Sequence, residues 1–282
     1  MGTGVAAAVI SVTSIGFLCA LMLAIASKVM AVRTDERVER IRGFLPGANC
    51  GACGFTGCDG YAEALVNGGA KPNLCIPGGA AVSMEISSSL GVDFEEVVEQ
   101  VAVVHCRGDG AARSRKMEYG GIGTCKAAKQ LFGGQNACTF GCLGFGDCAA
   151  ACPNGAVCIE NGLARINTRK CTGCRLCAKI CPNGVIFTEA DTITTVVTCM
   201  NTERGASVRK KCSCGCIGCL RCVRECPAEA ISVTDNLARI DYEKCTGCGK
   251  CAEVCVTGCI RQANFSGVFK AAAVPETPAQ EL

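Results

Sequence analysis

The longest apolar pattern lies at the start of the chain. Residues 5–27 form a run of 23 positions without a charged side chain. As a helix rising about 1.5 Å per residue, this run is roughly 34 Å long, enough to cross the hydrocarbon core of a membrane. A cleaved signal peptide would need a basic stretch before a shorter apolar run. Basic residues instead follow the run: Lys28, Arg33, Arg37, Arg40 and Arg42. We therefore predict a single-pass anchor in the cell (inner) membrane, with the bulk of the chain on the cytoplasmic side.

Shorter apolar patterns predict further elements. Residues 101–106 and 195–199 are apolar runs that each end in a cysteine, which is typical of strands. Residues 59–67 predict a short helix that begins directly after Cys58. Four apolar residues spaced i, i+3, i+4 and i+7 indicate one face of a helix over 94–101: Phe94, Val97, Val98 and Val101.

Cysteine dominates the composition, with 28 cysteines among 282 residues and a single histidine. A Rieske centre needs two histidines on one iron, and the common histidine-based zinc sites need at least two, so these sites are excluded. The formal net charge of +3 is too small to indicate a nucleic-acid-binding protein. In a reducing compartment, clustered cysteines indicate metal ligands rather than disulfides.

The second half of the chain contains a duplicated unit with a period of 74 residues. Residues 163–166 (LARI) recur at 237–240. Eight cysteines also recur at the same offset: Cys138, Cys142, Cys148, Cys152, Cys171, Cys174, Cys177 and Cys181 correspond to Cys212, Cys216, Cys222, Cys226, Cys245, Cys248, Cys251 and Cys255. We therefore expect two copies of one module.

The cysteine spacing within each copy is the C-x2-C-x2-C-x3-C run of bacterial ferredoxins, which bind [4Fe-4S] clusters. In ferredoxins with two clusters, the fourth cysteine of each run binds the other cluster. This rule predicts three ligand sets: Cys216, Cys219, Cys222 and Cys255; Cys245, Cys248, Cys251 and Cys226; Cys171, Cys174, Cys177 and Cys152.

The remaining set of the first module departs from the pattern, because Phe145 occupies the position of Cys219. Cys138 is the nearest substitute, and it gives the predicted set Cys138, Cys142, Cys148 and Cys181.

Two further groups of cysteines are candidates for clusters. Cys50, Cys53, Cys58 and Cys75 lie in a glycine-rich segment, where the backbone can approach a cofactor closely. They predict a fifth [4Fe-4S] site, with a zinc site of four cysteines as the alternative. Four cysteines outside the regular runs are candidates for a sixth site, with free buried thiols as the alternative: Cys106, Cys125, Cys199 and Cys212.

These features together resemble the B subunit of the Rnf complex, in its long form with several clusters. The resemblance rests on the anchor, the basic linker, the G-x-N-C-G-x-C-G-x3-C motif at residues 47–58 and the ferredoxin modules, and it spans residues 1–265. It implies an electron-transfer subunit of a membrane-bound ferredoxin:NAD⁺ oxidoreductase that translocates Na⁺ or H⁺. Its partners would be soluble ferredoxin and subunits that carry flavin, the NAD site and the ion pathway.

The chain itself shows no nucleotide-binding motif and no credible nucleophile, so we expect no flavin, no NAD and no bond-making active site on it. A membrane-anchored polyferredoxin that serves a hydrogenase or another reductase is the alternative function, and a four-cysteine zinc scaffold is the non-redox alternative.

We expect an α+β fold of six parts. These are the transmembrane anchor (1–32), a small four-cysteine domain (33–82), a connecting α/β segment (83–136), two ferredoxin-like modules (137–190 and 191–265) and a disordered tail (266–282).

Overall fold

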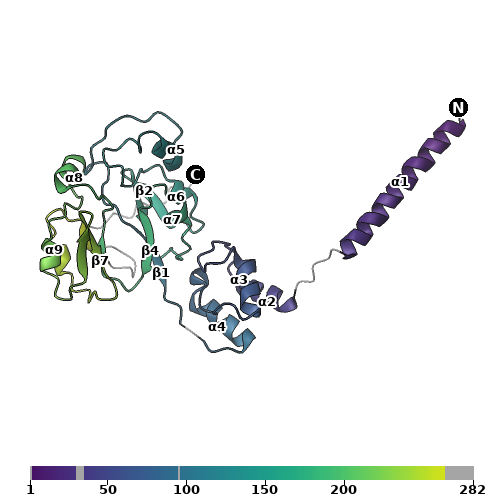
Figure 1. Ribbon diagram of the computed structural model, residues 1–282, viewed down its shortest axis with the longest axis horizontal. Coiled ribbons are helices and arrows are strands. Elements are labelled where there is room, and N and C mark those ends of the chain that lie inside the picture. The colour runs from purple at the N-terminus through teal and green to yellow at the C-terminus, as the bar shows by residue number, and fades with distance from the viewer. Residues whose placement is uncertain (1, 30–34, 95, 264–282) are drawn as a thin grey trace, which may run out of the picture.

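The computed structural model describes residues 2–29, 35–94 and 96–263. The predicted disordered tail, 266–282, lies outside these residues. Figure 1 shows a long helix, a small helical domain and a body that contains all the strands, in this order from the N-terminus.

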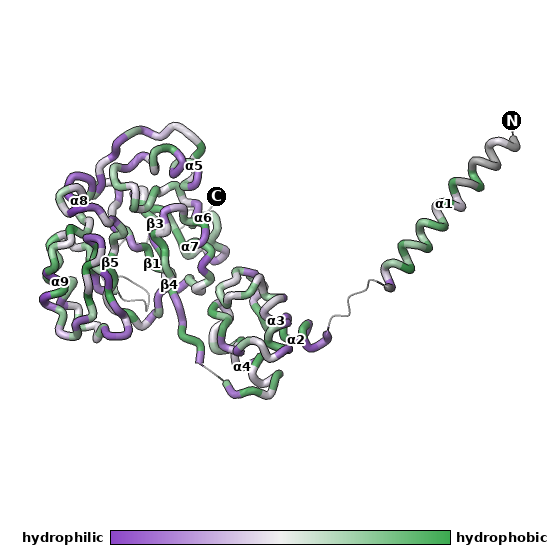
Figure 2. Tube along the Cα trace, viewed as in Figure 1, coloured by the Kyte–Doolittle hydropathy of each residue, from purple (hydrophilic) through white to green (hydrophobic). Residues whose placement is uncertain are grey.

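Helix α1 (Gly2–Val29) stands apart from the other elements (Figure 1). Most of it is hydrophobic (Figure 2), and large side chains such as Phe17 and Met22 are exposed in the chain by itself. Among the residues that the structure describes, no helix combines the length and apolarity needed to cross a membrane. The predicted spanning helix is therefore not confirmed.

The helical domain packs three helices around an apolar core that contains Ile41, Tyr61 and Ile86. Asp35 caps the first helix by accepting a hydrogen bond from the Arg37 amide. The helix predicted at 59–67 is confirmed and begins one residue earlier. The elements are α2 (Glu36–Phe44), α3 (Cys58–Val66), the short 3-10 helix η1 (Ile76–Gly78) and α4 (Gly79–Leu90).

The body consists of two modules whose elements correspond at the 74-residue offset, so the duplication predicted from sequence is a structural repeat. The repeated part of each module has two short helices and a central antiparallel hairpin, β2–β3 or β6–β7. Module 1 contains α6 (Asp147–Ala150), β2 (Val157–Glu160), β3 (Leu163–Ile166), α7 (Leu176–Ile180) and β4 (Ile186–Ala190). Module 2 contains α9 (Arg221–Arg224), β6 (Ile231–Thr234), β7 (Leu237–Ile240), α10 (Lys250–Glu253) and β8 (Ile260–Gln262).

A strand from outside the cysteine runs completes each module. Strand β1 (Gln100–Val104) pairs antiparallel with β4, and β5 (Thr195–Val197) pairs antiparallel with β8. Both predicted strands are confirmed. The connecting segment predicted at 83–136 thus supplies a strand of module 1.

The helix predicted over 94–101 is wrong, because β1 begins at Gln100. Along β1 the side chains alternate between two cores, and a helix cannot produce this period of two. Val101 and Val103 pack with Val196 between the modules, whereas Ala102 joins the core of module 1.

Module 1 also carries an insertion between β1 and its first cysteine run. The equivalent cysteines Cys138 and Cys212 lie 32 residues after Cys106 and 13 residues after Cys199, respectively. The insertion contains α5 (Cys125–Gln130), whereas α8 (Gly205–Lys211) lies in the shorter segment of module 2.

Candidate iron–sulfur centres

The loops of the cysteine runs share one backbone conformation. In each loop, the residues on either side of the middle ligand position adopt left-handed backbone angles, for example Gly218 (φ 64°) and Leu220 (φ 63°) around Cys219. Such alternation turns successive N–H groups toward one side and creates a concavity suited to a negatively charged group. Gly144 (φ 83°) and Gly146 (φ 92°) retain this conformation around Phe145, although phenylalanine cannot bind iron.

Module 2 brings both of its predicted sets together. The four cysteines of the Cys216 set (Cys216, Cys219, Cys222 and Cys255) line one cavity. In the Cys245 set (Cys226, Cys245, Cys248 and Cys251), burial raises the pKa of Cys251 to about 11, and the other three thiols contribute to the rise. The structure therefore groups these thiols as the spacing predicts.

Module 1 brings its regular set together in the same way. The Cys171 set (Cys152, Cys171, Cys174 and Cys177) lines one cavity. The Ala156 amide donates to the Cys152 sulfur at 3.3 Å, and the equivalent Ala230 amide donates to the Cys226 sulfur at 3.4 Å. Amide donors to sulfur are typical of the surroundings of iron–sulfur sites.

The irregular set of module 1 differs from the prediction. Burial raises the pKa of Cys148 to about 12, and the neighbouring thiols that contribute include Cys142, Cys125 and Cys181. Cys125 thus takes the place that the sequence analysis gave to Cys138. We call this group the Cys142 set (Cys125, Cys142, Cys148 and Cys181).

Asp147 explains how the distant Cys125 reaches this set. Its carboxylate accepts hydrogen bonds from the Cys125 amide at 2.9 Å and from the Lys126 amide at 3.1 Å. Asp147 directly precedes Cys148, so these bonds fix the start of α5 beside the cysteine run. Phe145 meanwhile packs edge-on against Tyr119, with ring centroids 5.4 Å apart.

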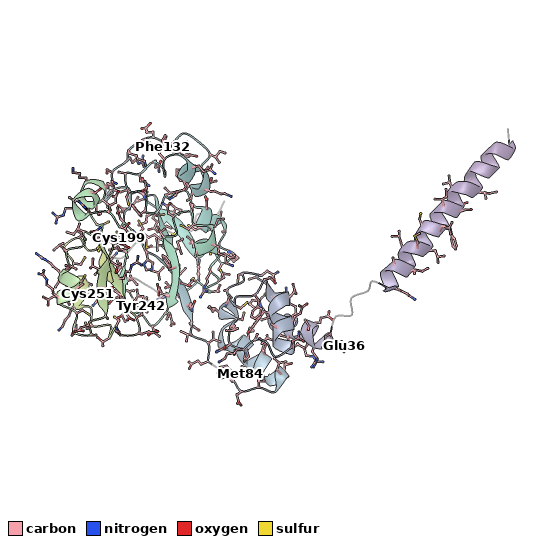
Figure 3. All side chains as sticks on the ribbon, viewed as in Figure 1. Glu36, Met84, Phe132, Cys199, Tyr242 and Cys251 are labelled. Carbon is pink, nitrogen blue, oxygen red and sulfur yellow. The ribbon has the colours of Figure 1, made fainter. Side chains whose placement is uncertain are left out.

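Cys138 lies in a different group. It lines a cavity between the modules together with three members of the predicted sixth site: Cys106, Cys199 and Cys212. Figure 3 labels Cys199 and Cys251 in the body, and both side chains are buried. Relative to the prediction, Cys125 and Cys138 are exchanged.

The N-terminal set (Cys50, Cys53, Cys58 and Cys75) is also grouped. Burial raises the pKa of Cys75 to about 11, and the other three thiols contribute. Asn49 holds the loop by accepting a hydrogen bond from the Cys58 amide at 2.9 Å. This domain contacts module 1, because Lys179 donates to the Cys50 carbonyl and Ile76 packs against Gly173.

Three other cysteines are not among the predicted ligands. Cys19 and Cys158 are exposed, on α1 and β2 respectively. Cys259 is buried with its sulfur 3.6 Å from that of Cys255.

The residues present fit [4Fe-4S] clusters. Each set offers four thiols, and such clusters are held by four cysteine thiolates. The raised pKa values are those of clustered thiols without a cation, and bound iron reverses this effect. Within the described ranges, no three His, Cys, Asp or Glu side chains form a group suited to a single metal ion.

Comparison with protein-family models supports this chemistry. Residues 45–77 match a putative Fe-S cluster family, residues 164–187 match a 4Fe-4S binding domain and residues 215–259 match a 4Fe-4S dicluster domain. None of these three segments contains Cys106, Cys125 or Cys138.

Whole-chain comparison with known proteins decides the family. The chain is 43% identical over 242 residues to the B subunit of the ion-translocating oxidoreductase complex of Methanosarcina acetivorans, covering 86% of this chain and 92% of that protein. The chain belongs to the Rnf B-subunit family. It is also 39% identical to the B subunit of the Na⁺-translocating ferredoxin:NAD⁺ oxidoreductase complex of Acetobacterium woodii, covering 87% of this chain and 74% of that protein. The proton-translocating counterpart from Clostridium ljungdahlii is 40% identical, with 88% and 89% covered.

Shorter Rnf B subunits match only part of the chain. The Klebsiella pneumoniae protein is 44% identical over 90 residues, which are 32% of this chain. Membership of the family agrees with the resemblance inferred from the motifs.

Proposed function

We propose that this chain is the electron-transfer subunit of a membrane-bound, ion-translocating ferredoxin:NAD⁺ oxidoreductase. It accepts electrons from reduced soluble ferredoxin and delivers them to membrane partners. Flavin, the NAD site and the ion pathway are on those partners. When bound, a [4Fe-4S] cluster takes up and returns one electron.

The observation that carries this proposal is the spatial succession of the cysteine sets. The N-terminal set adjoins the Cys171 set, because Ile76 follows Cys75 and packs against Gly173, between Cys171 and Cys174. The Cys171 set adjoins the Cys142 set, because the thiol of Cys177 contributes to the raised pKa of Cys148. The Cys216 and Cys245 sets exchange ligands within module 2. This order suits a chain that conducts electrons from one end to the other.

The two ends of this succession suit different partners. The N-terminal set belongs to the domain next to α1, whereas module 2 lies farthest from α1 (Figure 1). Cys248 of the terminal Cys245 set is exposed. We infer that soluble ferredoxin meets the module 2 end, and that the N-terminal set faces the membrane partners.

We also infer that α1 attaches the chain to the membrane part of the complex. Its apolar side chains, such as Phe17, Leu18 and Met22, are exposed and would be covered there. The basic residues that follow, Lys28 and those of α2, support a position of the body on the cytoplasmic side. Deletion of residues 2–29 should move the brown protein from the membrane fraction to the soluble fraction.

Anaerobic purification of the complex tests the function. We expect partner subunits that carry flavin, about 20 or more iron atoms per chain, and visible absorption that dithionite bleaches. Cys174→Ser should remove one cluster and abolish ferredoxin-dependent NAD⁺ reduction by membranes, whereas Cys158→Ser, a change at an exposed thiol, should leave it intact. A nickel or molybdenum partner, or full activity in Cys174→Ser, would contradict the proposal.

A further inference from the structure

A small cavity lies at the boundary between the two modules. Module 1 contributes Cys106 and Cys138 to its wall, and module 2 contributes Cys199 and Cys212. Neither module alone supplies these four cysteines to this space, so it exists only because the modules pack together.

The four cysteines are two equivalent pairs. Cys138 and Cys212 correspond at the 74-residue offset. Cys106 and Cys199 correspond in structure, since each lies two residues beyond the end of its strand, β1 or β5. The residue between continues the ladder in both modules, because the His105 amide donates to the Val185 carbonyl and the Thr198 amide to the Cys259 carbonyl, each at 2.7 Å. The cavity is therefore lined by the same two positions of each copy.

Equivalent hydrogen bonds connect this cavity to the centre on either side. The Cys142 amide donates to the Cys106 sulfur at 3.4 Å, and the Cys216 amide donates to the Cys199 sulfur at 3.3 Å. Cys142 and Cys216 are the first ligands of the neighbouring sets. A single hydrogen bond therefore connects a cysteine of the cavity to the first cysteine of each neighbouring set.

The buried residue Asn201 donates hydrogen bonds to two of these sulfurs, one from its side chain and one from its backbone. Asn201 is 2% exposed, its side-chain amide donates to the Cys138 sulfur and its backbone amide donates to the Cys199 sulfur, both at 3.5 Å. The Glu203 amide donates to the side-chain oxygen Oδ1 of Asn201 at 2.7 Å and so fixes which end of the side chain faces the sulfur. Donors fixed in this way stabilise thiolates.

Glycines leave room for the sulfurs. A methyl group added at Gly141 would lie 3.2 Å from the Cys106 sulfur and 3.8 Å from the Cys138 sulfur. One added at Gly108 would lie 3.2 Å from the Cys212 sulfur. A backbone bridge between Arg113 and Cys212 holds the module 2 segment against module 1 at this point.

We propose that Cys106, Cys138, Cys199 and Cys212 hold a sixth [4Fe-4S] cluster, and that Cys125 is a ligand of the Cys142 set. Uptake of a preformed [4Fe-4S]²⁺ core forms four Fe–S bonds and releases four thiol protons, with no change of oxidation state. Cys214 also lines the cavity, with its sulfur 3.5 Å from that of Cys212. Its equivalent is Phe140, so it lies outside the repeated pairs.

The sixth site deepens the proposed function, on which it rests, by joining the two halves of the succession. Without it, the proposed order has no cluster between the Cys142 set of module 1 and the Cys216 set of module 2. With it, the order is continuous from the N-terminal set to the Cys245 set. Electrons that enter at module 2 would have to pass this junction.

Pairs of cysteine substitutions test which thiols share a cluster. We expect about 24 iron atoms per wild-type chain from six clusters. Cys138→Ala combined with Cys212→Ala should leave about 20, because both ligands serve one cluster. Cys125→Ala combined with Cys212→Ala should leave about 16, because the ligands serve two clusters. The assignment based on sequence alone predicts the reverse pair of results and would replace ours.

Two measurements keep the test independent of misfolded variants. Native mass spectrometry of the wild-type chain counts clusters directly, and alkylation of the folded holoprotein should spare Cys138 while modifying Cys158. A count of five clusters with Cys138 alkylated would overturn the sixth site and leave the proposed function intact. Six clusters in a complex that cannot couple ferredoxin to NAD⁺ would contradict the proposed function and leave the sixth site intact.

Discussion

The two modules differ at one position of their first cysteine run. Module 2 has Cys219 at the middle position of this run, and Cys219 is exposed. Module 1 has Phe145 at that position, and we propose that Cys125, which an insertion supplies and Asp147 holds, is the ligand in its place. The loop backbone around both positions is left-handed in the same places. The comparison shows that a duplicated loop can keep its backbone conformation after it has lost the cysteine at its middle position.

The difference also changes the surroundings of the Cys142 set. Cys125 is buried, whereas Cys219 is exposed. The insertion that carries α5 therefore covers a face that module 2 leaves open to solvent. A covered cluster is shielded from water and oxygen, and burial is one of the factors that set a cluster's reduction potential.

The strongest test of this comparison removes the substitute ligand. Cys125→Ala should cost module 1 its Cys142 cluster and abolish ferredoxin-dependent NAD⁺ reduction, because a thiolate ligand and part of the buried wall disappear together. Iron analysis should show a loss of one to about four atoms per chain. Cys158→Ala is the matched control, with unchanged iron. Retention of all iron in Cys125→Ala would show that Cys125 is not a ligand.

A second test asks whether the regular ligand position is still functional. Phe145→Cys in the Cys125→Ala background should restore iron toward the wild-type value, because Gly144 and Gly146 already give the loop its ligand-binding conformation. Loss of the contact between Phe145 and Tyr119 should lower stability by about 1 kcal/mol. Iron per chain and the temperature of cluster bleaching measure the two effects. No gain of iron would mean that the insertion has moved the loop out of reach.

The regular sets were predictable from sequence because their spacing is local. Three ligands within seven residues, such as Cys171 to Cys177, fix their own geometry through a short loop. The fourth ligand follows from the duplication within each module. Both strands, β1 and β5, were predicted, but the spacing of Phe94 and Val97 wrongly indicated a helix that continues to residue 101, where β1 lies.

Cys125 was not predictable in the same way, because a tertiary hydrogen bond to Asp147 determines its place. The repeat did, however, carry a signal about Cys138. Its correspondence with Cys212 implies that both have the same role, and spacing alone assigned them to different sites. The structure places both Cys138 and Cys212 in the wall of one cavity, so their equivalence in the repeat is the signal on which our proposal for Cys138 depends.

A smaller effect is expected when the equivalent glycines Gly218 and Gly144 are replaced, because the two replacements should lower stability by different amounts. Gly218→Ala should cost about 1–2 kcal/mol of stability, since its φ of 64° is left-handed and the added carbon would lie 3.0 Å from the Asn236 carbonyl. Gly144→Ala should cost roughly twice as much, because the added carbon would lie 2.1 Å from the Gly162 carbonyl and the backbone must move. Cluster bleaching during heating under argon should occur earlier in Gly144→Ala. Equal bleaching temperatures would show that the two loops tolerate strain alike.

The smallest expected effect is a change in reduction potential, and it comes from Cys259, whose equivalent in module 1 is Val185. The Cys259 thiol lies 3.6 Å from the Cys255 sulfur, and hydrogen bonding with it lowers the pKa of Cys255 to about 5 and of Cys216 to about 6. Donation to a ligand sulfur stabilises the more negative, reduced cluster, so Cys259→Val should lower the potential of the Cys216 cluster and leave iron content unchanged. A hydrogen bond worth about 1 kcal/mol corresponds to about 40 mV. The reciprocal Val185→Cys in module 1 should raise a potential by a similar amount in an EPR-monitored titration. An unchanged potential in both variants would show that this thiol fills space without tuning the cluster, and loss of iron in Cys259→Val would make it a ligand.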